Sequence, residues 1–154
     1  MLFLGAVLFT LLVDQLSKAV IQHFLAEGQS LPVIPHFFHL TYVLNPGAAF
    51  GLFAHRTAFF VAATLAVIGL VLVMALRMPG HWRLLRLGMG LVLGGAAGNL
   101  IDRIRLGLVV DFLDFRVWPV FNLADSAIFL GALLLAWEIW KRGNEKEPKG
   151  NPQA

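Results

Sequence analysis

The sequence predicts an all-α integral membrane protein with four transmembrane helices and a small extracytoplasmic sheet. Hydrophobic residues make up 58% of the 154 residues and charged residues only 14%, with a mean hydropathy of +0.77. Soluble domains are about half apolar and a quarter charged, so lipid is the expected solvent for much of this chain. Four apolar segments each approach the roughly 20 residues that cross a bilayer core, and Lys and Arg gather at their ends.

The four apolar segments cover residues 1–24, 58–76, 84–104 and 121–140. The first lacks the basic start and the clear cleavage site of a signal peptide, and it carries Asp14 and Lys18 in its second half, so we expect a mature membrane helix. We expect a single domain over residues 1–142. The remaining residues, 143–154, are rich in Glu, Lys, Pro and Gly and predict a disordered cytoplasmic tail.

The distribution of basic residues predicts the orientation of the chain. The link at residues 77–86 and the C-terminal residues 141–154 together hold seven of the twelve Lys and Arg residues, so this face and both termini are expected to be cytoplasmic. Loops 22–57 and 105–120 are then extracytoplasmic. The first loop contains LPVIPHFFHLTYVL, which is typical of short strands, and it is punctuated by Pro32, Pro35, Pro46, Gly47 and Gly51. We expect a small sheet at the outer membrane surface.

Composition excludes several classes of function. The absence of cysteine excludes disulfides, thiolate metal sites and cysteine nucleophiles. The net charge of +3 comes from residues at the ends of apolar segments, a distribution that does not favour nucleic-acid binding. The histidine spacings predict no metal site, and we expect no cofactor. No internal repeat is visible, which disfavours a transporter built on inverted repeats.

Polar residues within the apolar segments are the first candidates for a site. Asp14 and Lys18 are four residues apart with the acid first, the favourable order for an ion pair on a helix. They can order the helix bundle, contact a ligand, or do both. In the third segment, Gly90, Gly94 and Gly98 recur every four residues and predict a face where another helix approaches closely.

The end of the third segment adds three polar residues on one helix face, because their spacing is i, i+3 and i+4. Asn99 can form an interhelical hydrogen bond, and Asp102 and Arg103 can form an interfacial ion pair. Each has an ordinary structural explanation alone. All three, however, are predicted at the same membrane boundary as the acid and base of the first segment.

Two further carboxylates stand in apolar surroundings at this boundary. Asp111 lies in VVDFLDF, and Asp125 lies just inside the fourth segment, where it can also be a helix-start carboxylate. Asp114 can simply be exposed. Two carboxylates held close together cannot both ionise easily, so they share a proton, as in aspartic proteases. The ionised member can then activate water while the protonated member assists the carbonyl and the leaving nitrogen.

Two other functions use the same residues. A metal-dependent membrane transferase could bind Mg²⁺ through carboxylate oxygens of the acidic cluster, that is Asp102, Asp111, Asp114 and Asp125. A small ion or proton carrier could use Asp14, Lys18 and Asp102, although a carrier needs polar groups near the middle of several spans.

Five motifs together resemble those of the lipoprotein signal peptidases, the signal peptidase II family of bacterial membrane aspartic proteases. They are DQLSK at residues 14–18, NPGAAFG at 45–51, GNLIDR at 98–103, VVDF at 109–112 and FNLADS at 121–126. The resemblance covers nearly the whole chain apart from the tail. It implies an inner-membrane endopeptidase that cleaves prolipoproteins on the amino side of a diacylglyceryl-modified cysteine, and we expect it to act as a monomer.

The resemblance also implies roles for individual residues. Asp111 and Asp125 would be the catalytic dyad, and Asn45 and Arg103 would help to hold the lipid-modified substrate. Residues supporting the site would be Asp14, Lys18, Asn99, Asp102 and Asn122, with Gly47 allowing the first loop to approach. The family fold makes loop 22–57 a β-cradle on the membrane surface and loop 105–120 a short lid-like helix.

Overall fold

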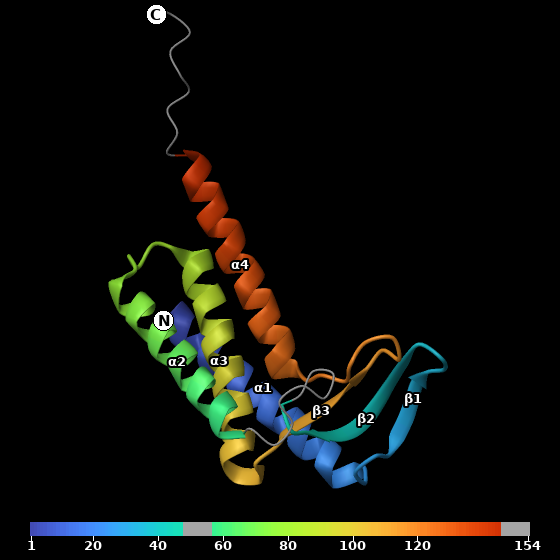
Figure 1. The fold of residues 1–154 in the computed structure, drawn as a ribbon. Coiled ribbons are helices and arrows are strands. Elements are labelled where there is room, and N and C mark those ends of the chain that lie inside the picture. Colours follow the sequence, from blue (N-terminus) through green and yellow to red (C-terminus); the bar gives the residue numbers. More distant parts are fainter. Residues whose placement is uncertain (48–56, 146–154) are drawn as a thin grey trace, which may run out of the picture.

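A computed structural model describes residues 1–47 and 57–145 of the chain (Figure 1). Gly51, the end of the NPGAAFG motif and residues 146–154 of the predicted tail lie outside the described residues. The tail was predicted to begin at residue 143, but residues 143–145 continue the last helix. The elements in chain order are α1 (Leu2–Phe24), β1 (Ser30–Ile34), β2 (Phe38–Asn45), α2 (Thr57–Arg77), α3 (Arg83–Leu106), β3 (Val109–Asp114) and α4 (Leu123–Glu145).

The four predicted helices are confirmed, and their ends fall close to the predicted ones. All four are long and apolar enough to cross a membrane. Their outer surfaces remain apolar: in α2, Val71 is the one buried residue, while Phe59 and Leu70 are among the large side chains that point outward. An apolar surface of this extent requires lipid as its solvent.

Helix α3 occupies the centre of the bundle and contacts α1, α2 and α4. The predicted glycine face packs against α1: a Cβ on Gly90 would lie 2.7 Å from the Ala6 Cβ, and one on Gly94 would lie 2.7 Å from the Thr10 Cβ. A second glycine face meets α4, where a Cβ on Gly95 would overlap the carbonyl oxygen of Ala124. Helix α3 therefore approaches two neighbours at backbone distance.

The sheet has the strand order β1-β2-β3, and both pairs are antiparallel. In Figure 1 it extends sideways from one end of the bundle, while α4 ends at the opposite end. The expectation of a short helix between α3 and α4 is wrong, because β3 occupies this segment. Its residues are β-branched, aromatic and aliphatic side chains with carboxylates at Asp111 and Asp114, and the strand pairs with β2.

Close packing of α3 on α4 gives the first prediction. Gly95→Ala should destabilise the protein by about 1 to 3 kcal/mol, because the added methyl group meets backbone that cannot move aside. Gly69→Ala in α2 is the matched control, since a Cβ there has nothing within 4 Å. Thermal unfolding in detergent, followed by helical circular dichroism, measures both. Equal unfolding midpoints for the two variants would contradict the packing described.

Candidate active site

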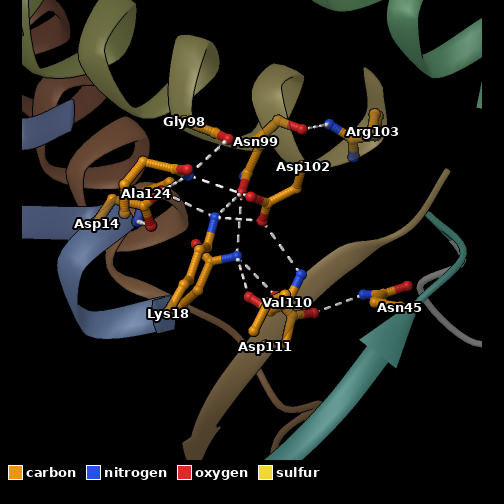
Figure 2. A network of polar contacts seen from close by, with 12 residues as sticks. Asp14, Lys18, Asn45, Gly98, Asn99, Asp102, Arg103, Val110, Asp111 and Ala124 are labelled. Atoms are coloured by element: carbon orange, nitrogen blue, oxygen red, sulfur yellow. Dashed lines mark hydrogen bonds and ion pairs between the residues drawn. The ribbon is translucent and has the colours of Figure 1, made fainter. Parts of the chain in front are cut away.

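The Lys18 ammonium group is the centre of a buried polar network (Figure 2). Its Nζ lies 2.9 Å from Asp14 Oδ2, 2.8 Å from Asp102 Oδ2 and 2.9 Å from Asn99 Oδ1. Lys18 is 2% exposed and Asp14 is fully buried. A lysine has three N–H donors, so each of them has an acceptor here. The predicted ion pair of α1 is confirmed, and it extends to α3.

The two acids of this network also bind backbone of other elements. Asp14 Oδ1 accepts a hydrogen bond from the Ala124 N–H in the first turn of α4, at 3.0 Å. Asp102 Oδ2 accepts one from the Val110 N–H of β3, at 3.2 Å. The acids thus fix the start of α4 and of β3 relative to α1 and α3. Asp102 pairs with Lys18 rather than with Arg103, contrary to the ion pair considered from sequence.

Gln15 is a member of the network that the sequence analysis missed. Its Nε2 lies 3.2 Å from Asp14 Oδ2, 3.2 Å from the Gly98 carbonyl oxygen and 3.1 Å from Asp102 Oδ1. It therefore also joins the two acids, and it shares Asp14 Oδ2 with the lysine. The only signal in the sequence was an amide directly beside an acid within an apolar segment.

Asn122 caps the start of α4 together with Asp125. The Asn122 Oδ1 accepts a hydrogen bond from the Asp125 N–H at 2.9 Å, and the Asp125 Oδ2 accepts one from the Asn122 N–H at 3.4 Å. This reciprocal arrangement is a capping box, here formed by Asn and Asp rather than by Ser or Thr and Glu. It fixes the Asp125 carboxylate at the start of α4. The sequence analysis expected this role for an acid at the beginning of the fourth apolar segment.

Three asparagines hold the two candidate carboxyl groups. The Asn99 Nδ2 donates to Asp125 Oδ1 at 2.8 Å, the Asn122 Nδ2 donates to Asp111 Oδ1 at 2.6 Å, and the Asn45 Nδ2 donates to Asp111 Oδ2 at 2.8 Å. Asn122 also donates to Asn99, which links the two halves. Neutral amides orient the carboxyl groups without supplying a compensating charge, so their charge stays available for chemistry.

A local backbone connection brings β3 next to the start of α4. The N–H groups of Phe112 and Leu113 donate to the Phe121 carbonyl oxygen, at 2.9 and 2.7 Å, and the Phe121 N–H donates back to Leu113. The ring of Phe121 stacks on that of Phe115, with centroids 5.9 Å apart. The chain therefore folds back on itself between β3 and α4, and this places Asp111 beside Asn122.

Burial and the nearby charge of Asp125 raise the pKa of Asp111 to about 7, although the hydrogen bonds from Asn45 and Asn122 act in the opposite direction. Asp111 is 2% exposed. A carboxyl group in such surroundings can hold a proton near neutral pH, which an ordinary aspartate does not. Proton sharing between the two acids, expected from sequence, is consistent with this environment.

Gly47 and Arg103 lie at the edge of the site. The Gly47 N–H donates to Asn45 Oδ1 at 2.9 Å, and Gly47 has a φ of +89°, where a side chain is strained. A Cβ at this position would also lie 2.5 Å from the Phe60 ring. The Arg103 guanidinium carbon lies 5.4 Å from the centre of the same ring, and Nη1 donates a 3.5 Å hydrogen bond to the Asn99 carbonyl oxygen.

Asp114 is separate from this site, because side chains three residues apart in a strand point to opposite faces. It is buried rather than exposed, and it accepts hydrogen bonds from Thr41 Oγ1 at 2.7 Å and from the Arg116 side chain at 3.0 Å. The four acids proposed for Mg²⁺ are therefore not together. Among residues 1–47 and 57–145, no group of three or more His, Cys, Asp or Glu residues is placed to hold a metal ion.

Four apolar helices that enclose a polar network of acids and amides at one end define an integral membrane protein with an enclosed polar site. Residues 6–141 match the sequence model of the family described as signal peptidase (SPase) II. The chain belongs to this family, whose members are peptidases.

Individual relatives agree with the family assignment. The chain is 53% identical to a lipoprotein signal peptidase of Pelotomaculum thermopropionicum, over 90% of this chain and 91% of the relative. It is 55% identical to one of Moorella thermoacetica, over 89% and 91% of the two chains. A solved bacterial membrane enzyme, 30% identical, superimposes with a TM-score of 0.88 and covers 97% of this chain and 93% of its own. The chain is a bacterial inner-membrane protein.

The lysine at the centre of the network gives the second prediction. Lys18→Met should destabilise the protein by about 3 to 5 kcal/mol, because Asp14 and Asp102 would remain as buried charges without a cation. Adding Asp14→Asn and Asp102→Asn should restore part of this loss. Unfolding in mixed micelles measures the series, and an unchanged unfolding midpoint for Lys18→Met would show that the ion pairs are not needed.

Proposed function

We propose that this peptidase cleaves prolipoproteins on the amino side of a diacylglyceryl-modified cysteine, with Asp111 and Asp125 as its catalytic dyad. The observation that carries the proposal is the environment of these two acids. Both have amide hydrogen-bond donors, and neither has a salt bridge among the ion pairs of the described residues. Asp14, Asp102 and Asp114, by contrast, each have a cation and are better explained as structural.

We assign the resting proton to Asp111 and the negative charge to Asp125. The raised pKa of Asp111 favours its protonated form, and the position of Asp125 in the first turn of α4 favours a carboxylate through the helix dipole. Asp125 then takes a proton from water as the oxygen attacks the peptide carbonyl. Asp111 donates its proton to the developing oxyanion, which gives a gem-diol. As the C–N bond breaks, the proton gained by Asp125 passes to the amine of the leaving cysteine, and Asp111 regains a proton from the gem-diol hydroxyl.

The remaining residues act through these two acids or on the substrate. Asn99 and Asn122 are positioning residues, and the Asp14, Lys18 and Asp102 network supports them. Asn45 holds Asp111 from the strand that leads to Gly47, and Arg103 provides a cation for the lipid-modified part of the substrate. The metal-dependent transferase is disfavoured because no group of acids or histidines among the described residues is placed to hold a metal ion. The Asp14, Lys18 and Asp102 group is internally satisfied, which disfavours a carrier.

We further propose that the single domain works as a monomer, with both termini cytoplasmic and the sheet on the extracytoplasmic side. The sheet and the two acids lie at the same end of the bundle, opposite to the link between α2 and α3, which Arg77 precedes and Arg83 and Arg86 follow. Basic residues near helix ends favour the cytoplasmic face. A substrate anchored by an apolar helix and acyl chains would then reach the dyad laterally from the outer leaflet.

The catalytic dyad gives the third prediction. Asp111→Asn and Asp125→Asn should each reduce cleavage of a diacylglyceryl-modified prolipoprotein by at least about a hundredfold, because general acid and base groups contribute effects of this order. Asn keeps the shape of the side chain, so insertion and folding should be retained. Asp114→Asn is the matched control, and it should remain active apart from any effect on the sheet.

Three results would contradict the assignment. Substantial processing by either dyad variant would exclude these acids as the catalytic pair. Loss of activity in excess chelator would instead favour the metal-dependent transferase site. Equal cleavage of the unmodified precursor would exclude recognition of the lipid group.

The pH dependence gives the fourth prediction. As the pH rises through about 7, Asp111 loses the proton that it must donate, so kcat/KM should fall above this pH, by about tenfold for each further unit. Initial rates in lipid vesicles measure the profile. Circular dichroism at each pH controls for unfolding, and a rate that stays constant well above pH 7 would exclude Asp111 as the acid.

A further inference from the structure

Four side chains on one face of the sheet form a network that the proposed function does not use. Its members are Ser30, His39, Thr41 and Asp114, called the sheet network below. Thr41 Oγ1 donates a hydrogen bond to Asp114 Oδ2 at 2.7 Å. Ser30 Oγ lies 2.8 Å from Thr41 Oγ1 and 3.1 Å from His39 Nδ1. These residues come from β1, β2 and β3, so the network joins all three strands.

The carboxylate at one end of the sheet network determines the donor in every bond. Burial raises the pKa of Asp114, but the hydrogen bonds from Thr41 and Arg116 lower it by more, so the pKa lies below its ordinary value. A carboxylate only accepts, and a hydroxyl group has a single O–H to donate. Thr41 therefore donates to Asp114 and accepts from Ser30. Ser30 in turn accepts from His39, so the neutral imidazole carries its hydrogen on Nδ1.

The other ring nitrogen of His39 has no partner among the described residues. In the tautomer that the sheet network requires, Nε2 is an acceptor without a hydrogen. This atom is buried and has no hydrogen bond. Protonation would turn it into a donor with no acceptor in reach, and an unpaired buried donor is unfavourable, more so when the group is charged. The sheet face therefore holds the neutral ring better than the protonated ring.

Neighbouring charges do not offset this effect. Asp114 pairs with His39 in register, but it is already neutralised by Arg116, whose backbone N–H lies 2.8 Å from Oδ1 and whose Nη1 lies 3.0 Å from Oδ2. Strand β1 contributes no titratable side chain. The Tyr42 hydroxyl group is bonded to Gln22 of α1. A charged imidazolium would thus meet a cation as well as a paired acid.

We propose that the sheet is a pH-sensitive element, in which protonation of His39 turns its ring out of the sheet network and loosens the β1–β2 hairpin. Histidine side chains gain their charge between about pH 5 and 8. Because the folded hairpin favours the neutral ring, its stability is complete at the upper end of this range and decreases as the pH falls.

The bond that would be lost lies at a weak point of the hairpin. The His39 Nδ1–H bond to Ser30 ties β2 to β1 beside the register shift between Pro32 and Ile34, where the ladder is interrupted. Strand β2 continues to Asn45, which supports one acid of the proposed dyad. The hairpin is thus connected to the site, and on the proposed topology it meets the extracytoplasmic solution.

The test is hydrogen–deuterium exchange of the backbone N–H groups of β1 and β2, on the full chain in lipid vesicles. After correction for the intrinsic pH dependence of exchange, protection should fall by about fivefold or more from about pH 8 to 5, the effect of one lost hydrogen bond. His39→Asn should abolish this dependence, because its amide nitrogen takes the place of Nδ1 and does not titrate. His36→Asn is the matched control, since His36 is exposed and its φ of +63° suits Asn.

A pH dependence present in the wild type and in His36→Asn, and absent in His39→Asn, supports the proposal. Protection that stays constant in the wild type, or that changes equally in all three proteins, would overturn it. Nitrogen NMR of the histidine-labelled wild type needs no substitution, and a neutral His39 with its hydrogen on Nε2 would also overturn it. None of these measurements reads cleavage, so their failure leaves the proposed function standing, and the dyad variants test that function separately.

Discussion

The three hydrogen bonds of the Lys18 ammonium group are the interaction on which the rest of the site depends. They join α1 to α3, and their acceptors continue to α4 through Asp14 and to β3 through Asp102. Removing these charges from water is costly, and a well-packed apolar core is often at least as stable as a buried ion pair. The charges instead provide geometric specificity. Apolar helices in lipid can rotate or slide against one another, whereas the three hydrogen bonds of Lys18 fix one arrangement of α1 on α3.

The site separates charges that are neutralised from charges that are not. Asp14 and Asp102 share the cation of Lys18, whereas Asp111 and Asp125 receive only neutral donors from asparagines. Asn99 has a part in both groups, since it accepts from Lys18 and donates to Asp125. The structural ion pairs therefore position Asp125 through Asn99, while the pKa of Asp111 remains raised by its burial.

The sequence was most informative where its signals are local. Helix ends, the Asp14 and Lys18 pair and the glycine face of α3 follow from composition and from spacings of three and four residues. Strand β3 was missed because its partner, β2, lies more than sixty residues earlier, and no local pattern separates VVDFLD from a short apolar helix. The role of Gln15 was missed for a similar reason, because two of its acceptors lie on another helix.

The capping box and the Leu113–Phe121 connection have a consequence for the newly made chain. Three helices are enough to assemble the Lys18 network, but Asp14 receives its backbone donor, and Asp111 its partner acid, only from α4. Chains emerge from the ribosome N-terminus first. A nascent chain that contains only α1 to α3 can therefore form the Lys18 network but still lacks Asp125. On the proposed dyad assignment, the chain therefore gains both catalytic acids only when its last helix inserts.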